Sequence, residues 1–397
     1  MAVQYGGRPA RGAARRLSWN DRTVRAVTYQ VVVVVLVVAG LWYFIDNTLE
    51  NLARLGLASG FGFMNKEAAF PIGESLIEYT PADTYGRALL VGIVNTLYVS
   101  AIGVVLATVI GTVIGILRLS QNWLINRLAS GYVELMRNTP LLLQLFFWYM
   151  IFLEVMPVAR QAFQPLPHVF VSNRGVLFPV PVADNAWTLA CVGVVIGAVV
   201  ALVVTSWARK RQAETGKQFP IVWAGLALLL GGALIGWLVG GAPTALDRPA
   251  LRGFNYVGGA EVSPEFVALL LGLVLYTAAF VAEIVRAGIL AITHGQTEAA
   301  LALGLRRNMV LRLIILPQAL RVIIPPMTSQ YLNLTKNSSL AVAIGFPDLV
   351  HLANSAINQT GQAIEGIAIV MAVYLTISLS ISAFMNWYNR RVALVER

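Results

Sequence analysis

Long uninterrupted apolar runs are the feature that most restricts the fold of this 397-residue chain. The run at 26–45, AVTYQVVVVVLVVAGLWYFI, has no charged residue and can cross a bilayer, which takes about 20 residues of helix. The chain is 57% hydrophobic and 12% charged, a balance that few soluble domains have. The runs are continuous, whereas a membrane barrel needs short alternating strands. We therefore predict an all-α, polytopic transmembrane helical bundle.

Eight spans are predicted from the bounds of these runs, at 26–45, 88–117, 138–157, 187–207, 221–240, 265–288, 320–345 and 365–387. The first run is longer than the apolar core of a cleaved signal peptide and ends in aromatic residues, so we expect it to stay as a helix. The predicted organisation is a segment at 1–25, an additional helix at 26–45, a main domain at 88–386 with an insertion at about 158–262, and a tail at 388–397.

The positive charge indicates how the chain is oriented in the membrane. Most of the 29 Lys and Arg residues lie before span 1, in alternate connections between spans, and after span 8. Cytoplasmic segments of membrane proteins carry such an excess of cations. The distribution predicts that both termini are cytoplasmic. Basic cytoplasmic loops also explain the net charge of +10, so we expect no nucleic-acid partner.

The loop at 295–317, GQTEAALALGLRRNMVLRLIILP, has the pattern of an ordered unit between two spans. Glu298 suits the first turn of a short helix, where a carboxylate interacts favourably with the helix dipole. The residues 299–303 are good helix formers. Gly304 can then end the helix in a left-handed conformation that other residues adopt at a cost. The sequence predicts a helix that stops at this glycine.

A second short helix is predicted beyond the glycine. Asn308 can cap its start, and Pro317 is expected to close it because proline resists a helix interior. Arg306 and Arg307 would be exposed between the two helices. A rigid two-helix unit suits docking into the groove of a partner. The alternative is an amphipathic loop that lies on lipid headgroups.

This loop resembles the EAA signature of permease subunits of bacterial ATP-binding cassette (ABC) importers, which it matches at Glu298, Ala299, Ala300, Gly304, Leu316 and Pro317. In that family the loop is the coupling helix region and inserts into a cleft of the ATPase subunit. The resemblance implies an ATPase-coupling role for Glu298, Ala299, Ala300, Gly304, Arg306, Arg307 and Pro317. Four blocks, among them YVELMRNTPLLLQLFF and LTKNSSLAVAIGFPDL, resemble the polar amino-acid branch of the family.

The layout of the spans departs from the five-helix core of these type I importers. An extra helix comes first, and a hairpin is inserted after the second core helix. This arrangement is similar to the larger permease subunits of general L-amino-acid and glutamate/glutamine/aspartate/asparagine importers. The resemblance implies import of polar L-amino acids across a bacterial inner membrane. It also implies three partners: a pair of ATPase subunits, a second homologous permease and a periplasmic amino-acid-binding protein.

The seventh predicted span is too polar for a helix that faces lipid. Gln330, Asn333 and Asn337 recur at i, i+3 and i+7 and share one face. Lys336 lies close to that face, and a lysine inside a span is costly and usually faces a cavity or a partner. One hypothesis is that these residues and Ser338 line the translocation path. The alternative is that Lys336 pairs with a carboxylate of a neighbouring helix and only fixes packing.

Glu283 and Arg286 are three residues apart near the end of span 6, which places them on one helix face as a possible ion pair. Because they precede the EAA loop, they could transmit motion of the ATPase into the membrane. A static structural pair is the alternative.

Several sequence patterns of other protein classes are missing. The chain has no GxxxxGK[ST] phosphate loop, so ATP hydrolysis is expected in a separate subunit and this chain should bind no cofactor. The chain also lacks the GxSxG and HExxH motifs, which would indicate an enzyme. Its three histidines have no metal-ligand spacing. A stand-alone, ion-coupled secondary amino-acid transporter is the alternative function. A suitable acidic residue in the middle of the membrane is lacking for it.

Overall fold

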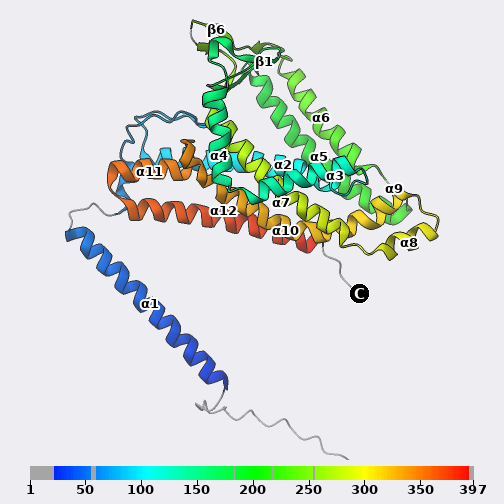
Figure 1. Ribbon diagram of the computed structural model, residues 1–397, viewed down its shortest axis with the longest axis horizontal. Coiled ribbons are helices and arrows are strands. Elements are labelled where there is room, and N and C mark those ends of the chain that lie inside the picture. Colours follow the sequence, from blue (N-terminus) through cyan, green and yellow to red (C-terminus); the bar gives the residue numbers. More distant parts are fainter. Residues whose placement is uncertain (1–21, 55–59, 183, 217–218, 254, 393–397) are drawn as a thin grey trace, which may run out of the picture.

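The computed structural model describes residues 22–54, 60–182, 184–216, 219–253 and 255–392. The described residues contain seven helices that are long and apolar enough to cross a membrane, and one bent helix pair that would make an eighth span. The prediction of a polytopic helical bundle is thus confirmed (Figure 1). Most of the predicted N-terminal segment at 1–25 and half of the predicted tail at 388–397 lie outside the described residues.

The core of the bundle forms where α2 (Tyr85–Leu117) packs along α7 (Pro264–Leu290). Small residues allow this close approach, because a Cβ atom on Gly111 would lie 2.6 Å from the Val281 side chain and 2.7 Å from the Ala278 carbonyl oxygen. Leu334 of α10 (Leu316–Asn337) is fully buried and packs against the same helices. These three helices position the candidate site.

The third span predicted at 138–157 is helical over 141–155, but the helix and the sharp bend before it were not predicted. The chain forms α3 (Trp123–Asn138) and α4 (Leu141–Met150), followed by a π-helical turn (Ile151–Val155), and the bend between the two parts is 105°. Thr139 and Pro140 have extended backbone at the bend. The cause is Pro140, because proline disfavours helical backbone at the residue before it.

The seventh span differs from its prediction at its start and ends at Ile344, one residue before the predicted end. Its helical segment starts earlier, since α9 (Arg307–Val310) and a π-helical turn (Leu311–Ile315) lead directly into α10. A 3₁₀ helix (Ser338–Ile344) follows α10, and a helix that the sequence reading missed comes next, α11 (Leu349–Thr360). The last span is α12 (Ala363–Val392).

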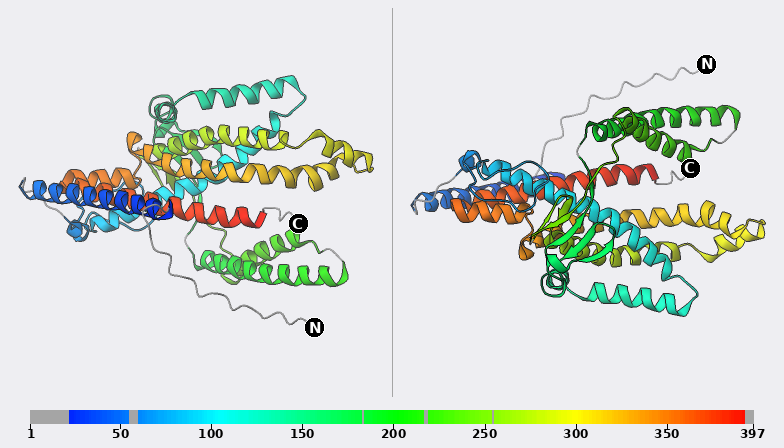
Figure 2. Two further views of the ribbon diagram at one scale, coloured as in Figure 1. Left: turned by 90° about the horizontal axis from the view of Figure 1, so that it is seen from below. Right: turned by 90° about the horizontal axis from the view of Figure 1, so that it is seen from above.

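Three further helices extend beyond this core. The hairpin of α5 (Asn185–Thr215) and α6 (Ile221–Val239) packs on itself through glycines, because a Cβ atom on Gly193 would lie 2.0 Å from the Gly232 carbonyl oxygen. Figure 2 shows this hairpin and α3 on opposite sides of the bundle. The N-terminal α1 (Arg22–Arg54) runs apart from the core (Figure 1).

A small sheet was also not predicted. Four strands pair antiparallel in the order β1-β2-β3-β8, and β8 comes from the far side of the α5–α6 insertion, with Val262 opposite Val176. Two separate two-stranded sheets, β4–β5 and β6–β7, also form in this region of the chain. The strands are β1 (Phe163–Leu166), β2 (Val169–Ser172), β3 (Gly175–Phe178), β4 (Val180–Pro181), β5 (Leu246–Asp247), β6 (Ala250–Arg252), β7 (Asn255–Val257) and β8 (Ala260–Val262).

Candidate functional site

The predicted two-helix loop is formed by α8 (His294–Ala302) and α9, at the end of the bundle opposite α11 (Figure 1). Gly304 has a φ of 78°, the left-handed conformation that the sequence predicted. The Gly304 and Leu305 N–H groups donate to the carbonyl oxygens of Leu301 (2.9 Å) and Ala300 (3.2 Å). The chain therefore turns sharply between the two helices.

Three details of this loop were predicted wrongly. The helix begins at His294, so Glu298 lies in its second turn. The cap of α9 is Arg306 and not Asn308, because the chain is already helical at Arg307. Pro317 does not end the helix, since the Leu316 N–H donates to the Leu311 carbonyl oxygen in a π-helical turn and the helix continues past the residue without an N–H.

The tip of the loop carries apolar and basic side chains that face outward. Leu303 is 82% exposed, beside Gly304, and Arg306 and Arg307 are also exposed. Glu298 and Ala299 are exposed on α8, whereas Ala300 is buried. A large exposed leucine at the turn between a short helix and the start of a long one is a surface suited to burial in a partner.

The predicted pair of Glu283 and Arg286 exists, and two further arginines join it. Arg286 Nη2 donates to Glu283 Oε1 at 2.7 Å, and Arg118 Nη1 donates to Glu283 Oε2. Arg137 Nη1 lies 3.8 Å from the same carboxylate. Arg118 follows α2 and Arg137 lies near the end of α3, so one carboxylate holds three helices together. We call these four residues the Glu283 cluster.

The polar face predicted on α10 lies on the surface of the chain. Asn333 and Lys336 are exposed, and Gln330 and Asn337 are half-buried. Lys336 forms no ion pair with any other described residue. Ser338 points elsewhere, because it is buried and its hydroxyl donates to the Thr335 carbonyl oxygen at 2.8 Å. The structure thus groups the first four residues and separates Ser338 from them.

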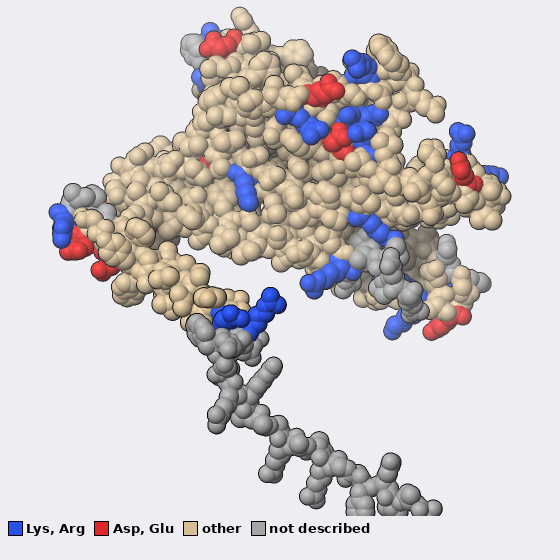
Figure 3. Space-filling view, turned by 60° about the horizontal axis from the view of Figure 1, so that its bottom comes forward, with Lys and Arg blue, Asp and Glu red and all other residues tan. Residues whose placement is uncertain are grey.

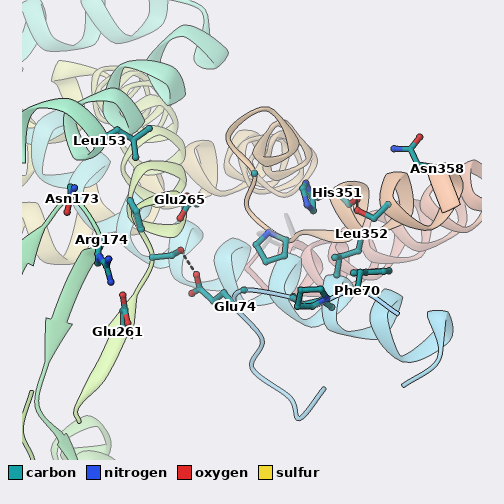
Figure 4. A pocket seen from close by; sticks show the side chains of 18 of the residues that line it. Phe70, Glu74, Leu153, Asn173, Arg174, Glu261, Glu265, His351, Leu352 and Asn358 are labelled. Carbon is teal, nitrogen blue, oxygen red and sulfur yellow. Dashed lines mark hydrogen bonds between the residues drawn. The ribbon is translucent and has the colours of Figure 1, made fainter. Parts of the chain in front are cut away.

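An open pocket of about 870 Å³ lies between the sheet, the segment before α2, and α11. Arg174 and Glu261 lie on its sheet side, and His351 and Leu352 on its α11 side (Figure 4). Burial raises the pKa of Glu74, and the negative charges of two further glutamates of the pocket add to this effect. The Ser263 hydroxyl donates to Glu74. The pocket is therefore acidic, and no signal in the local sequence pattern pointed to it.

Asp348 caps α11 beside this pocket and is fully buried. It accepts hydrogen bonds from the His351 N–H (2.8 Å) and the Tyr374 hydroxyl (3.4 Å). Nearby, Leu349 packs so closely on α2 that a Cβ atom on Gly92 would lie 2.8 Å from its Cα atom. Burial raises the pKa of Asp348 from 3.8 to about 7.

This raised pKa predicts a pH-dependent stability. The native state keeps a proton that the unfolded state releases between pH 3.8 and about 7, so the free energy of unfolding should fall as pH rises through that window. The total loss is at most about 4 kcal/mol. Asparagine does not titrate, but it also caps helices. The Asp348→Asn variant should therefore fold, and its melting temperatures, measured by scanning fluorimetry in detergent, should lose this pH dependence. The exposed Asp46→Asn should keep it, and an unchanged slope in Asp348→Asn would assign the titration to another group.

Comparison with known proteins gives a consistent result. The family described as binding-protein-dependent transport system inner membrane component matches residues 264–394. The general L-amino acid transport system permease protein AapQ of Rhizobium johnstonii is 49% identical, over 97% of this chain and 96% of the relative. The putative amino-acid ABC transporter permease protein YhdX of Escherichia coli is 50% identical, over 96% of this chain and 97% of the relative. The glutamate/glutamine/aspartate/asparagine transport system permease protein BztB of Rhodobacter capsulatus is 43% identical, over 95% and 96%.

Proposed function

Because this chain belongs to the binding-protein-dependent transport system inner membrane components, as a permease subunit of an amino-acid ABC importer, we propose that it carries polar L-amino acids across the bacterial inner membrane. The relatives are ABC permease proteins, and this favours an ATP-driven importer over an ion-coupled secondary transporter. Hydrolysis of ATP takes place in a separate pair of ATPase subunits, and this chain binds no cofactor.

The α8–α9 loop is the observation that carries the coupling part of this proposal. It projects from one end of the bundle (Figure 1), and its tip exposes Leu303 beside the left-handed Gly304. Apolar side chains that fill a partner's pocket dominate the energy of an interface. The loop therefore docks into the ATPase on the cytoplasmic side, and both termini of the chain lie on that side as well, as the basic segments favour. Motion of the ATPase then reaches α7 and α10, the helices that flank the loop.

The opposite end of the bundle faces the periplasm in this arrangement. A periplasmic amino-acid-binding protein docks there and delivers its ligand near the acidic pocket of Figure 4. The exposed polar face of α10 then needs a second wall, because Asn333 and Lys336 are too polar to lie against lipid. A second, homologous permease supplies that wall, so the translocation path runs between the two permeases.

Lys336→Met tests whether this face lines the path. The lysine would interact with the substrate carboxylate, and a hydrogen bond to a charged group contributes about 1.5–3 kcal/mol. We therefore expect the variant to lower the uptake rate at least about tenfold. Uptake of labelled amino acids into proteoliposomes measures it, with the exposed Lys66→Met as the matched control. An unchanged rate and an unchanged amino-acid preference would mean that Lys336 serves only packing.

Purification of the tagged chain from its native membrane in a mild detergent tests the whole proposal. Mass spectrometry should find an ATPase with a phosphate-binding loop and a second permease with an EAA loop among the co-purifying proteins. A chain that purifies alone and still transports in vesicles without ATP would instead be a secondary transporter, and its α8–α9 loop would lie on lipid headgroups.

A further inference from the structure

The Glu283 cluster carries more positive charge than its single carboxylate can neutralise. Arg118 is the most enclosed of its arginines, with 12% of its side chain exposed, and it donates to both Glu283 and Ser130. This arginine alone balances the charge of Glu283. The guanidinium groups of Arg137 and Arg286 are therefore in excess, and 41% and 33% of their side chains remain exposed.

The hydrogen-bond donors of these two arginines are mostly unused. A guanidinium has five N–H donors. Arg286 uses one of them on Glu283, and its Nε atom is buried without a hydrogen-bond partner among the described residues. Arg137 forms an ion contact at 3.8 Å and lies over the Phe280 ring at 5.2 Å, but it donates no hydrogen bond to any described residue. An anion with several acceptor oxygens would satisfy these donors.

The cluster lies at a depth where a lipid headgroup can reach it. Arg118 directly follows α2, and Arg286 lies four residues before the end of α7, just before the α8–α9 loop. Figure 2 shows α3, which carries Arg137, at the edge of the bundle. Figure 3 shows that charged side chains are sparse over most of the face turned to the viewer.

An apolar groove adjoins Arg137 along the same helix. It has a volume of about 370 Å³ and lies in the elbow between α3 and α4, lined by Leu135, Met136, Leu143, Phe147 and Trp148. Leu135 and Met136 come directly before Arg137 in the sequence. A basic site with an apolar groove within one helical turn matches the two parts of a phospholipid, a charged headgroup and an acyl chain. An acidic side chain of a protein partner would need only the basic site and not the apolar groove.

We propose that Arg137 and Arg286 bind the phosphate of an anionic phospholipid from the cytoplasmic leaflet, with an acyl chain in the α3–α4 groove. Basic pockets between transmembrane helices on the cytoplasmic side bind such headgroups. The bound lipid connects α3 and α7 through its phosphate, beside the loop that couples to the ATPase. The cytoplasmic placement rests on the proposed function, but the binding itself does not depend on transport.

Native mass spectrometry of the purified complex tests this proposal by counting bound phosphatidylglycerol and phosphatidylcholine. Arg137→Gln should lower the affinity for phosphatidylglycerol about fivefold and leave that for phosphatidylcholine nearly unchanged. Arg127→Gln is the matched control, because it removes the same charge from an exposed position of the same helix. Arg137→Lys should retain most of the selectivity. Arg286→Gln removes the other arginine of the site and replaces Arg137→Gln as the test if that variant fails to fold.

Three results would overturn the proposal. Equal phosphatidylglycerol binding by Arg137→Gln and Arg127→Gln would mean that the cluster does not bind the lipid. Displacement of the lipid by excess inorganic phosphate would indicate a site for free phosphate. Loss of a co-purifying subunit from Arg137→Gln, with lipid binding intact, would identify an acidic side chain of that subunit as the occupant. Because lipid counting needs no ATP or substrate, a failure here leaves the transport proposal untouched.

Discussion

Replacing Gly304 with valine is expected to abolish ATP-driven uptake while the chain still inserts into the membrane. The added Cβ atom would meet nothing within 4 Å, so the effect does not come from a clash. It comes from the backbone, because φ is 78° and a left-handed conformation costs roughly 1–2 kcal/mol for a residue with a Cβ atom, and more for a β-branched one. The turn would relax to another conformation and redirect Leu303. Uptake into proteoliposomes and chain abundance in the membrane measure the two effects.

The same loop offers a matched control at Gly295. This glycine also has open space around an added Cβ atom, but it lacks the positive φ of Gly304. Gly295→Val should therefore transport close to wild type. Gly304→Asn should retain part of the activity, because asparagine adopts the left-handed conformation more readily than valine. If Gly304→Val transports normally at normal abundance, the turn does not couple ATP use to transport. If Gly295→Val fails equally, added bulk and not backbone strain is the cause.

The turn at Gly304 was predictable because glycine adopts the left-handed conformation that ends a helix more readily than other residues. The cap at Arg306 was not, because its side chain makes no capping hydrogen bond and the chain is simply extended there. Asn308 is the better capping residue, but the left-handed turn at Gly304 fixes where the next helix can start. In the same way, the π-helical turn before Pro317 overrides the local tendency of proline to end a helix.

The apolar runs predicted which segments cross the membrane, but they contained little information about bends and distant pairings. The apolar run at 138–157 did not predict the 105° bend near its start, although Pro140 lies at that bend. The pairing of β3 with β8 could not be predicted, because it spans the whole α5–α6 hairpin. Short strands whose partner lies so far away leave no local periodicity to detect.

The candidate site shows the same limit. Helical spacing was enough to pair Glu283 with Arg286, because residues three apart share a face. Arg118 and Arg137 come from other helices, so only the packing of α2 and α3 on α7 brings them to the same carboxylate. The sequence therefore predicted the pair within one helix, but it did not predict the contacts that form only when three helices pack together.

Glu283→Gln is expected to destabilise the folded chain by about 3 kcal/mol, the low end of the cost of removing one partner of a buried ion pair, because 27% of the Glu283 side chain is exposed. The change leaves three arginines, from α2, α3 and α7, around a neutral side chain. Arg118 is affected most, because its guanidinium is enclosed and cannot turn to solvent at low cost. Scanning fluorimetry of the detergent-solubilised complex should show a melting temperature several degrees lower.

Two comparisons separate the charge from the packing of Glu283. Glu134→Gln makes the same chemical change one turn before Arg137, at an exposed position, and should melt like the wild type. Glu283→Gln combined with Arg118→Met should recover part of the loss, because the enclosed cation that lost its partner is then removed as well. An unaltered melting temperature in Glu283→Gln would show that solvent, and not Glu283, screens the repulsion between the arginines.

The surrounding lipid should change the size of this loss if the arginines bind a phosphate. In Glu283→Gln the site gains one positive charge, so an anionic headgroup is attracted more strongly than in the wild type. A bound ligand stabilises the folded state according to its affinity. The melting temperature lost on mutation should therefore be smaller in phosphatidylglycerol bilayers than in phosphatidylcholine bilayers. An equal loss in both lipids would mean that Glu283 neutralises the arginines without help from the membrane, and that these side chains act only as a clamp between α2, α3 and α7.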